Sequence, residues 1–477
     1  METRSEDINN KQPAAPPETI QKYLDHYGSC IKWHAAAPSL KGIENVVVIP
    51  ALAESESLFK TLGSLSRNSP VELKKTLVLC VINNRKSDGD SNSDYKDNRT
   101  TLKLLDSIVT KVPGRLDRSE IREIFERKLQ IGYIDASSPG LELPAEKGGV
   151  GLARKIGMDA SLTFFDYGVQ SPKLIFSLDA DTLVDTGYLS TIRNRFVQGR
   201  ISAAVIAFSH QPNEDGNLND AILWYETFMR YYTLGLEYAC SPYAYHSIGS
   251  AIVSTAEAYV SVRGMSVRDA GEDFHYLNKL AKAVTLSKIE DIRVYPSSRV
   301  SCRVPFGTGK TIARLQKDRS SRYKVYAPEI FTILKRWLEC LQHHAQEDGM
   351  FLLKRADTIS AALTEFLVKE NFPVIWTKLR KNSSKKNVTI RHAMTWFDAL
   401  KTFRLVRYMT HHGYPAVDMY PALAHILALR GVNPPGGIDE MPLPARETRK
   451  VVLDILRKQE KLCPANVEAD MHENPAY

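Results

Sequence analysis

The chain has 477 residues, of which 43% are hydrophobic and 25% are charged, and its net charge is +8. These proportions are ordinary for a soluble globular protein and exclude a collagen-like or low-complexity chain. The surplus of Lys and Arg suits an anionic ligand, but it is too small for this length to indicate a nucleic-acid-binding protein.

The cysteines and the hydropathy indicate in which cellular compartment the protein is expected. Six cysteines are scattered without a Cys-X-X-Cys pair, which argues against a zinc site or a disulfide framework and favours a reducing compartment. The N-terminus lacks the apolar core of a secretory signal, and no apolar run is long enough to span a bilayer. We therefore expect a cytoplasmic protein without a transmembrane segment.

The first elements predict a parallel sheet. Residues 1–19 are polar and proline-containing, which predicts disorder, and residues 18–27 have the pattern of a short helix. Two apolar runs rich in β-branched residues, 45–50 and 76–82, are typical of strands that are covered on both faces. Helical spacing over 54–65 joins them, and a strand–helix–strand order favours parallel pairing.

The next elements continue the alternation of strands and helices. Residues 85–98 are strongly polar and predict a loop, after which helical periodicity covers 101–110 and 118–129. A third strand is expected at 130–135. A glycine-rich segment, 147–155, then opens a further helix. This alternation is typical of an α/β protein.

Two carboxylates follow the next buried strand. The apolar run 173–176 leads into Asp179 and Asp181, and residues spaced i, i+2 on a strand point to one side. Mg²⁺ and Mn²⁺ take oxygen ligands and often bridge to phosphates. The pair is therefore a candidate to hold a metal against a diphosphate, although an isolated Asp-X-Asp also commonly forms a turn.

The remaining elements complete the predicted organisation. A strand is expected at 202–208 and a long aromatic-rich helix at 219–236. We predict an α/β domain over 40–315, with a Rossmann-like, mostly parallel central sheet flanked by helices. A helical C-terminal domain is expected over 323–461, and a flexible tail over 462–477.

Polar residues at several strand and helix ends predict one shared site. Segments 50–54, 83–84 and 179–181 each follow a strand, and open parallel sheets bind ligands at the carboxyl ends of their strands. Gly148 to Arg154 places free backbone N–H groups and a guanidinium at a helix start, which suits an anion. Gly271 to Asp273 opens another helix, where a carboxylate serves as a cap or, in a cleft, as a general base.

The order of these motifs resembles the family 2 glycosyltransferases of the GT-A fold, over residues 46–309. The resemblance implies transfer of a sugar from a UDP- or GDP-sugar to a hydroxyl of a glycan or lipid-linked acceptor. It also implies Mn²⁺ or Mg²⁺ as cofactor and inversion at the sugar C1. The matching motifs are Ile49-Pro50-Ala51-X-X-Glu54, Gly151-X-Ala153-Arg154-X-X-Gly157, Leu178-Asp179-Ala180-Asp181-Thr182 and Gly271-Glu272-Asp273.

The resemblance assigns roles in donor binding. By its motif, the ribose and base of the nucleotide are held by Pro50, Ala51 and Glu54. Arg154 is implied to approach the nucleotide and Asp179 to face the ribose.

It also assigns the metal, the base and the acceptor side. Asp181 is implied as the metal ligand and Asp273 as the general base, with Glu272 beside it. Asn83 stands where the family usually has an Asp-rich sequence that grips the base, and an amide can still pair with a base edge because it both donates and accepts. Segment 247–251 looks like an acceptor-side strand.

Residues 299–310 are a candidate mobile lid after the last strand. Two glycines permit backbone movement, and Arg303 and Lys310 carry charge that suits a diphosphate. An ordinary connector has the same composition. The segment 304–311 also ends like a P-loop, but Val304 stands where a glycine is required.

Two other functions remain open from the sequence. A nucleotidyltransferase uses a similar sheet and acidic metal site, and would release pyrophosphate rather than a nucleoside diphosphate. A non-catalytic protein whose C-terminal half binds a partner is the other alternative.

Overall fold

The structure is a computed structural model that describes residues 15–29, 32–86, 93–111, 118–299, 324–383, 385–434 and 436–459. Most of the predicted disordered N-terminus, the lid segment after Arg299 with Arg303 and Lys310, and the predicted tail lie outside these residues. Residues 18 and 19 begin helix α1 (Glu18–Tyr27), so the prediction of disorder up to residue 19 was wrong there and the helix prediction was right.

The chain divides into two compact units. One comprises Met1–Asn213 and Tyr245–Ala313, and the other comprises Glu214–Ala244 and Arg314–Tyr477. This division differs from the predicted boundaries at two places. The α/β domain was predicted to start at residue 40, but β1 (Ala35–Ala36) already belongs to its sheet. Helix α8 (Gly216–Tyr238), which the prediction placed inside the α/β domain, groups with the C-terminal helices.

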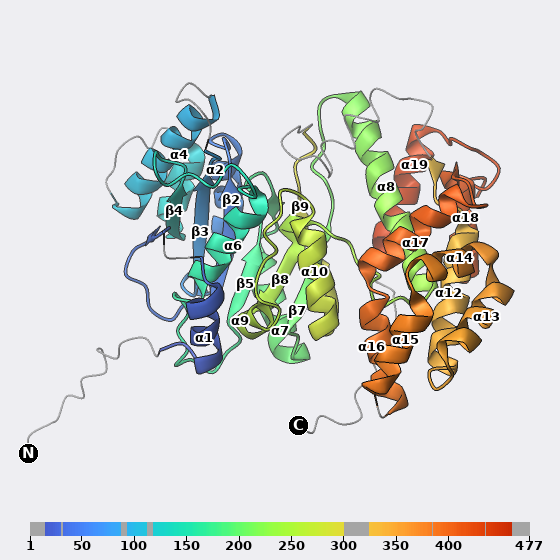
Figure 1. Ribbon diagram of the computed structural model, residues 1–477. Coiled ribbons are helices and arrows are strands. Elements are labelled where there is room, and N and C mark those ends of the chain that lie inside the picture. Colours follow the sequence, from blue (N-terminus) through green and yellow to red (C-terminus); the bar gives the residue numbers. More distant parts are fainter. Residues whose placement is uncertain are drawn as a thin grey trace, which may run out of the picture. The chain divides into compact units, whose positions relative to one another are not determined.

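Within the described residues, the first unit is built on a nine-stranded sheet with the order β1-β4-β3-β2-β5-β8-β7-β9-β6. Strands β4, β3, β2 and β5 run parallel, β8 is antiparallel to both of its neighbours, and β7 pairs in parallel with β9 (Figure 1). The predicted fold class, a mostly parallel central sheet flanked by helices, is confirmed. The strands are β1 (Ala35–Ala36), β2 (Asn45–Ala51), β3 (Thr76–Asn83), β4 (Gln130–Ala136), β5 (Leu174–Ser177), β6 (Leu183–Val184), β7 (Ala203–Phe208), β8 (Ile252–Thr255) and β9 (Leu286–Tyr295).

Two predicted stretches of this unit have a different secondary structure, and the helix at Tyr188–Gly199 was not predicted. The polar stretch predicted as a loop up to residue 98 is helical from Ser93 onward. The predicted acceptor-side strand at 247–251 holds a short 3₁₀ helix, and β8 begins only at Ile252. The helices are α1, α2 (Ser57–Ser66), α3 (Pro70–Leu73), α4 (Ser93–Val109), α5 (Ser119–Glu126), α6 (Val150–Ser161), α7 (Tyr188–Gly199), η1 (Gly249–Ala251), α9 (Ala256–Ser261) and α10 (Glu272–Ala283).

Helix α6 lies directly on the central strands. Every residue of β2 and β3 is buried, as expected for strands covered on both faces. A Cβ atom on Gly157 would lie 2.8 Å from Cγ2 of Val81 and still closer to Cγ1 of Val48. The absence of a side chain at Gly157 therefore lets α6 approach the sheet, which fixes the position of Arg154 one turn earlier.

The second unit is helical, as predicted, with one addition. Two short strands, β10 (Lys324–Val325) and β11 (Val417–Asp418), form an antiparallel pair that the helical pattern did not indicate. Its helices are α8, α12 (Pro328–His343), α13 (Gly349–Ile359), α14 (Ala361–Lys369), α15 (Phe372–Lys381), α16 (Lys386–Trp396), α17 (Ala399–His411), α18 (Met419–Leu429) and α19 (Arg446–Gln459).

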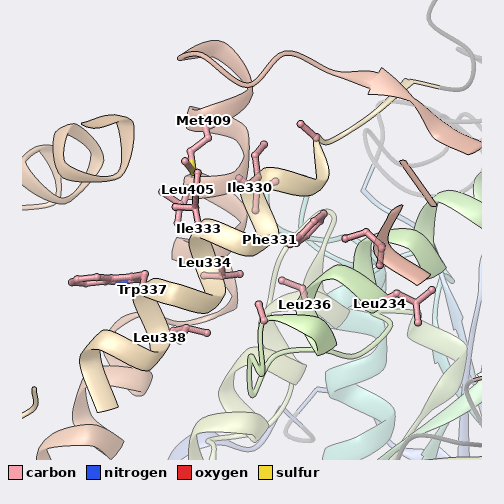
Figure 2. Packing of buried hydrophobic residues seen from close by; sticks show 14 of the residues in the cluster. Leu234, Leu236, Ile330, Phe331, Ile333, Leu334, Trp337, Leu338, Leu405 and Met409 are labelled. Carbon is pink, nitrogen blue, oxygen red and sulfur yellow. The ribbon is translucent and has the colours of Figure 1, made fainter. Parts of the chain in front are cut away.

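The core of this unit forms around α8 and α12. Leu234 and Leu236 of α8 belong to the same buried cluster as Phe331, Leu334 and Trp337 of α12 (Figure 2). Removing these apolar surfaces from water is the main stabilising contribution of such a cluster. Among the described residues, no helix combines the length and the apolar character needed to cross a membrane.

Candidate functional site

The strand ends meet at one edge of the sheet. Strands β2, β3 and β5 are parallel, so their carboxyl ends share that edge. Ala51 and Asn83 are the last residues of β2 and β3, and Asp179 follows the end of β5 by two residues. The expected convergence of these segments is observed.

Arg154 links three of the sequence motifs. This residue lies in α6 and is only 3% exposed. Its Nη2 donates to Oδ1 of Asp179 and its Nη1 donates to Oε1 of Glu272. The glycine segment, the Asp-X-Asp turn and the start of α10 are thereby brought to one guanidinium, which the resemblance predicted only as separate roles.

The surroundings of Arg154 keep it charged and in place. Burial tends to lower the pKa of its guanidinium, but the charges of Asp179 and Glu272 oppose this and leave that pKa raised above its ordinary value. Gly249 lies against the guanidinium, since a Cβ there would be 2.6 Å from Nη1 and 2.7 Å from Cζ. The carbonyl of Gly249 accepts from Oγ of Ser177 at 2.7 Å.

The start of α10 carries the candidate base. Gly271 precedes the helix with φ +69°, a left-handed conformation that favours glycine. Glu272 is buried against Arg154, and Asp273 is half-buried with its Oδ1 accepting from the Phe274 N–H at 2.7 Å. Burial and the adjacent charge of Glu272 raise the pKa of Asp273, while Arg154 lowers it in part. A raised carboxyl pKa suits a group that must take up a proton.

The backbone of the Asp-X-Asp turn is held by two hydrogen bonds. Oγ1 of Thr61 donates to the Ala180 carbonyl at 2.9 Å, and Nε2 of Gln211 donates to the Asp181 carbonyl at 2.9 Å. Burial and the charge of Asp179 raise the pKa of Asp181 to about 6. The two hydrogen bonds thus hold the backbone of the turn that carries the Asp181 side chain.

Arg299 joins the site although the sequence interpretation did not select it. Its Nη2 lies 2.9 Å from Oδ2 of Asp181 and also donates to Oε1 of Glu54. Strand β9 runs in the same direction as β5, so its carboxyl end reaches the same edge, and Arg299 follows that end by four residues. The sequence signal that could have identified Arg299 is its position as a basic residue shortly after the last strand of the sheet.

Asn98 is a second residue that the sequence interpretation missed. Its Oδ1 accepts from the Ala53 N–H at 2.8 Å, and its Nδ2 donates to the Asn83 carbonyl at 3.0 Å. Ala53 itself has φ +51°. Asn98 thus ties together the segments that follow β2 and β3. Asn83 lies at the predicted edge but is only 5% exposed.

The carboxylates of the site bear on whether a metal could bind there. Across the described ranges, no group of three or more His, Cys, Asp or Glu side chains is arranged to hold an ion. Asp179 and Asp181 each face a guanidinium, from Arg154 and Arg299 respectively. Mg²⁺ and similar ions are commonly bound by one or two carboxylates together with substrate phosphates. The donor set fits a cation that binds together with a diphosphate.

Comparison with known proteins gives structural similarity only. No family model matches the chain, and no curated protein matches it. Solved structures with similarity include TarS residues 1–349 from S. aureus, at 12% identity and TM-score 0.35, covering 72% of this chain and 92% of that one.

Two further structures are a mannosyltransferase from Pyrobaculum calidifontis in complex with GDP-Man and Mn²⁺, and glucosyl-3-phosphoglycerate synthase from Mycobacterium tuberculosis. The first has 12% identity and TM-score 0.34, covering 86% of this chain and 91% of that one. The second has 12% identity and TM-score 0.29, covering 52% and 70%.

Proposed function

We propose that the protein is a metal-dependent glycosyltransferase. It would move a sugar from a UDP- or GDP-sugar to a hydroxyl group of a glycan or lipid-linked acceptor. The observation that carries this proposal is the double ion pair of Arg154 with Asp179 and Glu272. It joins a candidate metal-and-diphosphate turn to a candidate base at the carboxyl edge of a parallel sheet, where such folds bind ligands.

The donor would lie along the ends of β2 and β3. In this proposal Pro50, Ala51 and Glu54 hold the ribose and base, and the amide of Asn83 is available for the base edge. Arg154 approaches the nucleotide and Asp179 faces the ribose. Arg303, which lies outside the described residues, is proposed as a further contact to the diphosphate.

Asp181 would hold Mn²⁺ or Mg²⁺. When bound, such an ion neutralises the charge that builds on the leaving diphosphate. Carboxylate oxygens are ligands that both ions accept, and one or two carboxylates together with substrate phosphates commonly suffice. The hydrogen bonds from Thr61 and Gln211 hold the backbone of the turn and make no contact with the Asp181 carboxylate.

Asp273 would act as general base. The acceptor oxygen forms a bond to C1 of the sugar while the bond from C1 to the diphosphate oxygen breaks and its electron pair leaves with the diphosphate. The acceptor proton passes to Asp273. A single displacement of this kind inverts the configuration at C1. Glu272 acts through Arg154, to which it is paired, and thereby positions the start of α10.

A panel of nucleotide sugars with Mn²⁺ tests the proposal. We expect one donor class to raise the melting temperature and to yield free nucleoside diphosphate, with both effects lost in EDTA. Asp181→Asn should lose the Mn²⁺-dependent part of the binding. Release of pyrophosphate from a sugar phosphate and a nucleoside triphosphate would instead establish a nucleotidyltransferase. A chain that binds no nucleotide and turns over none would contradict the proposal.

A further inference from the structure

Arg299 occupies the accessible side of the candidate metal turn. Its guanidinium spans two carboxylates from different strand ends, Glu54 after β2 and Asp181 after β5. The Arg299 side chain is 37% exposed, whereas those of Glu54 and Asp181 are 7% and 23% exposed. Arg299 is therefore the partner that can leave this cluster without opening the core.

The charge balance of the site distinguishes the role of Arg299 from that of Arg154. Carboxylates outnumber guanidinium groups among the site residues discussed above, and Arg154 is committed to Asp179 and Glu272 in a buried setting backed by Gly249. Among the residues that the structure describes, Arg299 is thus the cation that pairs with Asp181. The site carboxylates are Glu54, Asp179, Asp181, Glu272 and Asp273.

We propose that Arg299 is a positioning residue that competes with the divalent cation for Asp181. This inference rests on the proposed function. Arg299 occupies Oδ2 of Asp181 and places a positive charge beside the carboxylate, so a metal ion must either bind against this charge or displace a charge-assisted contact, which is among the stronger hydrogen bonds in proteins. Neutralisation of the guanidinium cannot relieve the competition, because Arg stays protonated at all ordinary pH values.

The competition gives an order to binding. When the metal ion binds alone and displaces Arg299 from Asp181, the guanidinium then has no new hydrogen-bond acceptor in place of the carboxylate. A nucleoside diphosphate that arrives with the metal supplies phosphate oxygens, which a guanidinium binds well through two parallel hydrogen bonds. The metal should therefore bind weakly by itself and strongly with the nucleotide, and Arg299 should move from Asp181 to the diphosphate.

The test is Mn²⁺ binding to the full chain, measured from the electron paramagnetic resonance signal of free Mn²⁺, with and without UDP or GDP. Without nucleotide, Arg299→Gln should bind Mn²⁺ at least about tenfold more tightly than the wild type, since a contact to a charged group is removed. Adding the nucleotide should tighten Mn²⁺ binding less in the variant, because the diphosphate loses a partner.

Arg195→Gln provides the matched control. Arg195 pairs with Asp291 at 2.7 Å in an exposed ion pair of the same unit, so its loss should leave Mn²⁺ binding at the wild-type value. Arg299→Lys should give an intermediate affinity because it keeps the charge but not the planar fork. This second variant also serves if Arg299→Gln folds poorly.

Equal Mn²⁺ affinities of the wild type and both Arg299 variants without nucleotide would overturn the inference. That result is separable from a failure of the proposed function. The proposed function fails when wild-type protein shows no Mn²⁺-dependent binding of any nucleotide, whereas the competition is judged from Mn²⁺ binding in the absence of nucleotide.

Discussion

The ionisation of Asp273 works against the stability of the folded protein. Burial and the charge of Glu272 raise its pKa above the value of about 3.9 that an exposed Asp has. The folded state therefore holds this proton more readily than the unfolded state. The resulting contribution to stability is fully present below the unfolded pKa and is lost as the pH rises through the raised folded pKa.

Asp273→Asn should therefore stabilise the protein at alkaline pH. Asn keeps an Oδ1 acceptor for the Phe274 N–H but cannot ionise. We expect its melting temperature to exceed that of the wild type by roughly one to a few degrees at about pH 8, with a smaller gain at about pH 5. Thermal melts at both pH values check this. An advantage that grows on acidification would contradict the assigned pKa shift.

Gly249→Ala should disturb the support of Arg154. The new Cβ would overlap the guanidinium, which two carboxylates hold in place. We expect a loss of about 1–3 kcal/mol in the free energy of unfolding, as for other overpacked sites, and weaker nucleotide binding. Denaturant titration and nucleotide-induced thermal shifts measure the two effects.

Gly63→Ala is the control for Gly249. A Cβ at Gly63 in α2 would meet Cβ of Glu120 at 3.6 Å, an ordinary contact. Because Ala suits a helix interior better than Gly, this variant should be neutral or more stable by up to about 1 kcal/mol. If both glycine variants changed the free energy of unfolding by the same amount, the close approach of Gly249 to Arg154 would make no contribution to stability.

At the scale of elements, the contact between α6 and the sheet sets the site. Gly157→Ala should cost about 1–3 kcal/mol of stability because its Cβ overlaps Val48 and Val81. Adding Val48→Ala should recover part of that loss, since it removes the nearest overlapping atom. Denaturant unfolding of the two single variants and the double variant gives the coupling energy. If the stability losses of the two single variants simply added in the double variant, the proposed overlap between residue 157 and Val48 would be refuted.

Much of the sheet could be predicted from single segments. The runs at 45–50 and 76–82 are fully buried in β2 and β3, as expected because strands covered on both faces are almost continuously apolar. Such a pattern reports burial and not strand direction. The reversal of β8 between β5 and β7 therefore had no local signal.

The remaining errors come from contacts between distant residues. The start of α4 is polar, yet Asn98 is buried because it bonds to Ala53 and Asn83. Likewise Arg299 meets Glu54 across 245 positions, and no spacing rule could connect them. The individual motifs of the site could be predicted from the sequence. The ion pairs of Arg154 and Arg299 that connect these motifs could be seen only in the folded structure.

At the scale of the whole molecule, α8 ties the middle of the chain to the C-terminal helices. Its residues Trp224, Tyr231, Leu234 and Leu236 belong to a cluster with residues of α12 and α18. A chain ending at Gln316 would expose these side chains to water. We expect it to be insoluble or markedly less stable, because large apolar patches promote association.

A chain ending at Gln459 is the matched control for that truncation. It retains every described helix and should keep the solubility and melting temperature of the full chain. Size-exclusion chromatography and thermal melts of both shortened chains decide the matter. A well-folded and fully active chain ending at Gln316 would show that α8 does not depend on the C-terminal helices.

The central claim is that this edge of the sheet binds a nucleotide sugar and that Asp273 takes the acceptor proton. Its most direct test is the release of nucleoside diphosphate per bound donor, measured with Mn²⁺ for the wild type and Asp273→Asn, with water or a glycan as acceptor. We predict at least a roughly hundredfold lower rate in the variant with donor affinity nearly unchanged. Weakened donor binding with unchanged turnover of each bound donor would contradict the account.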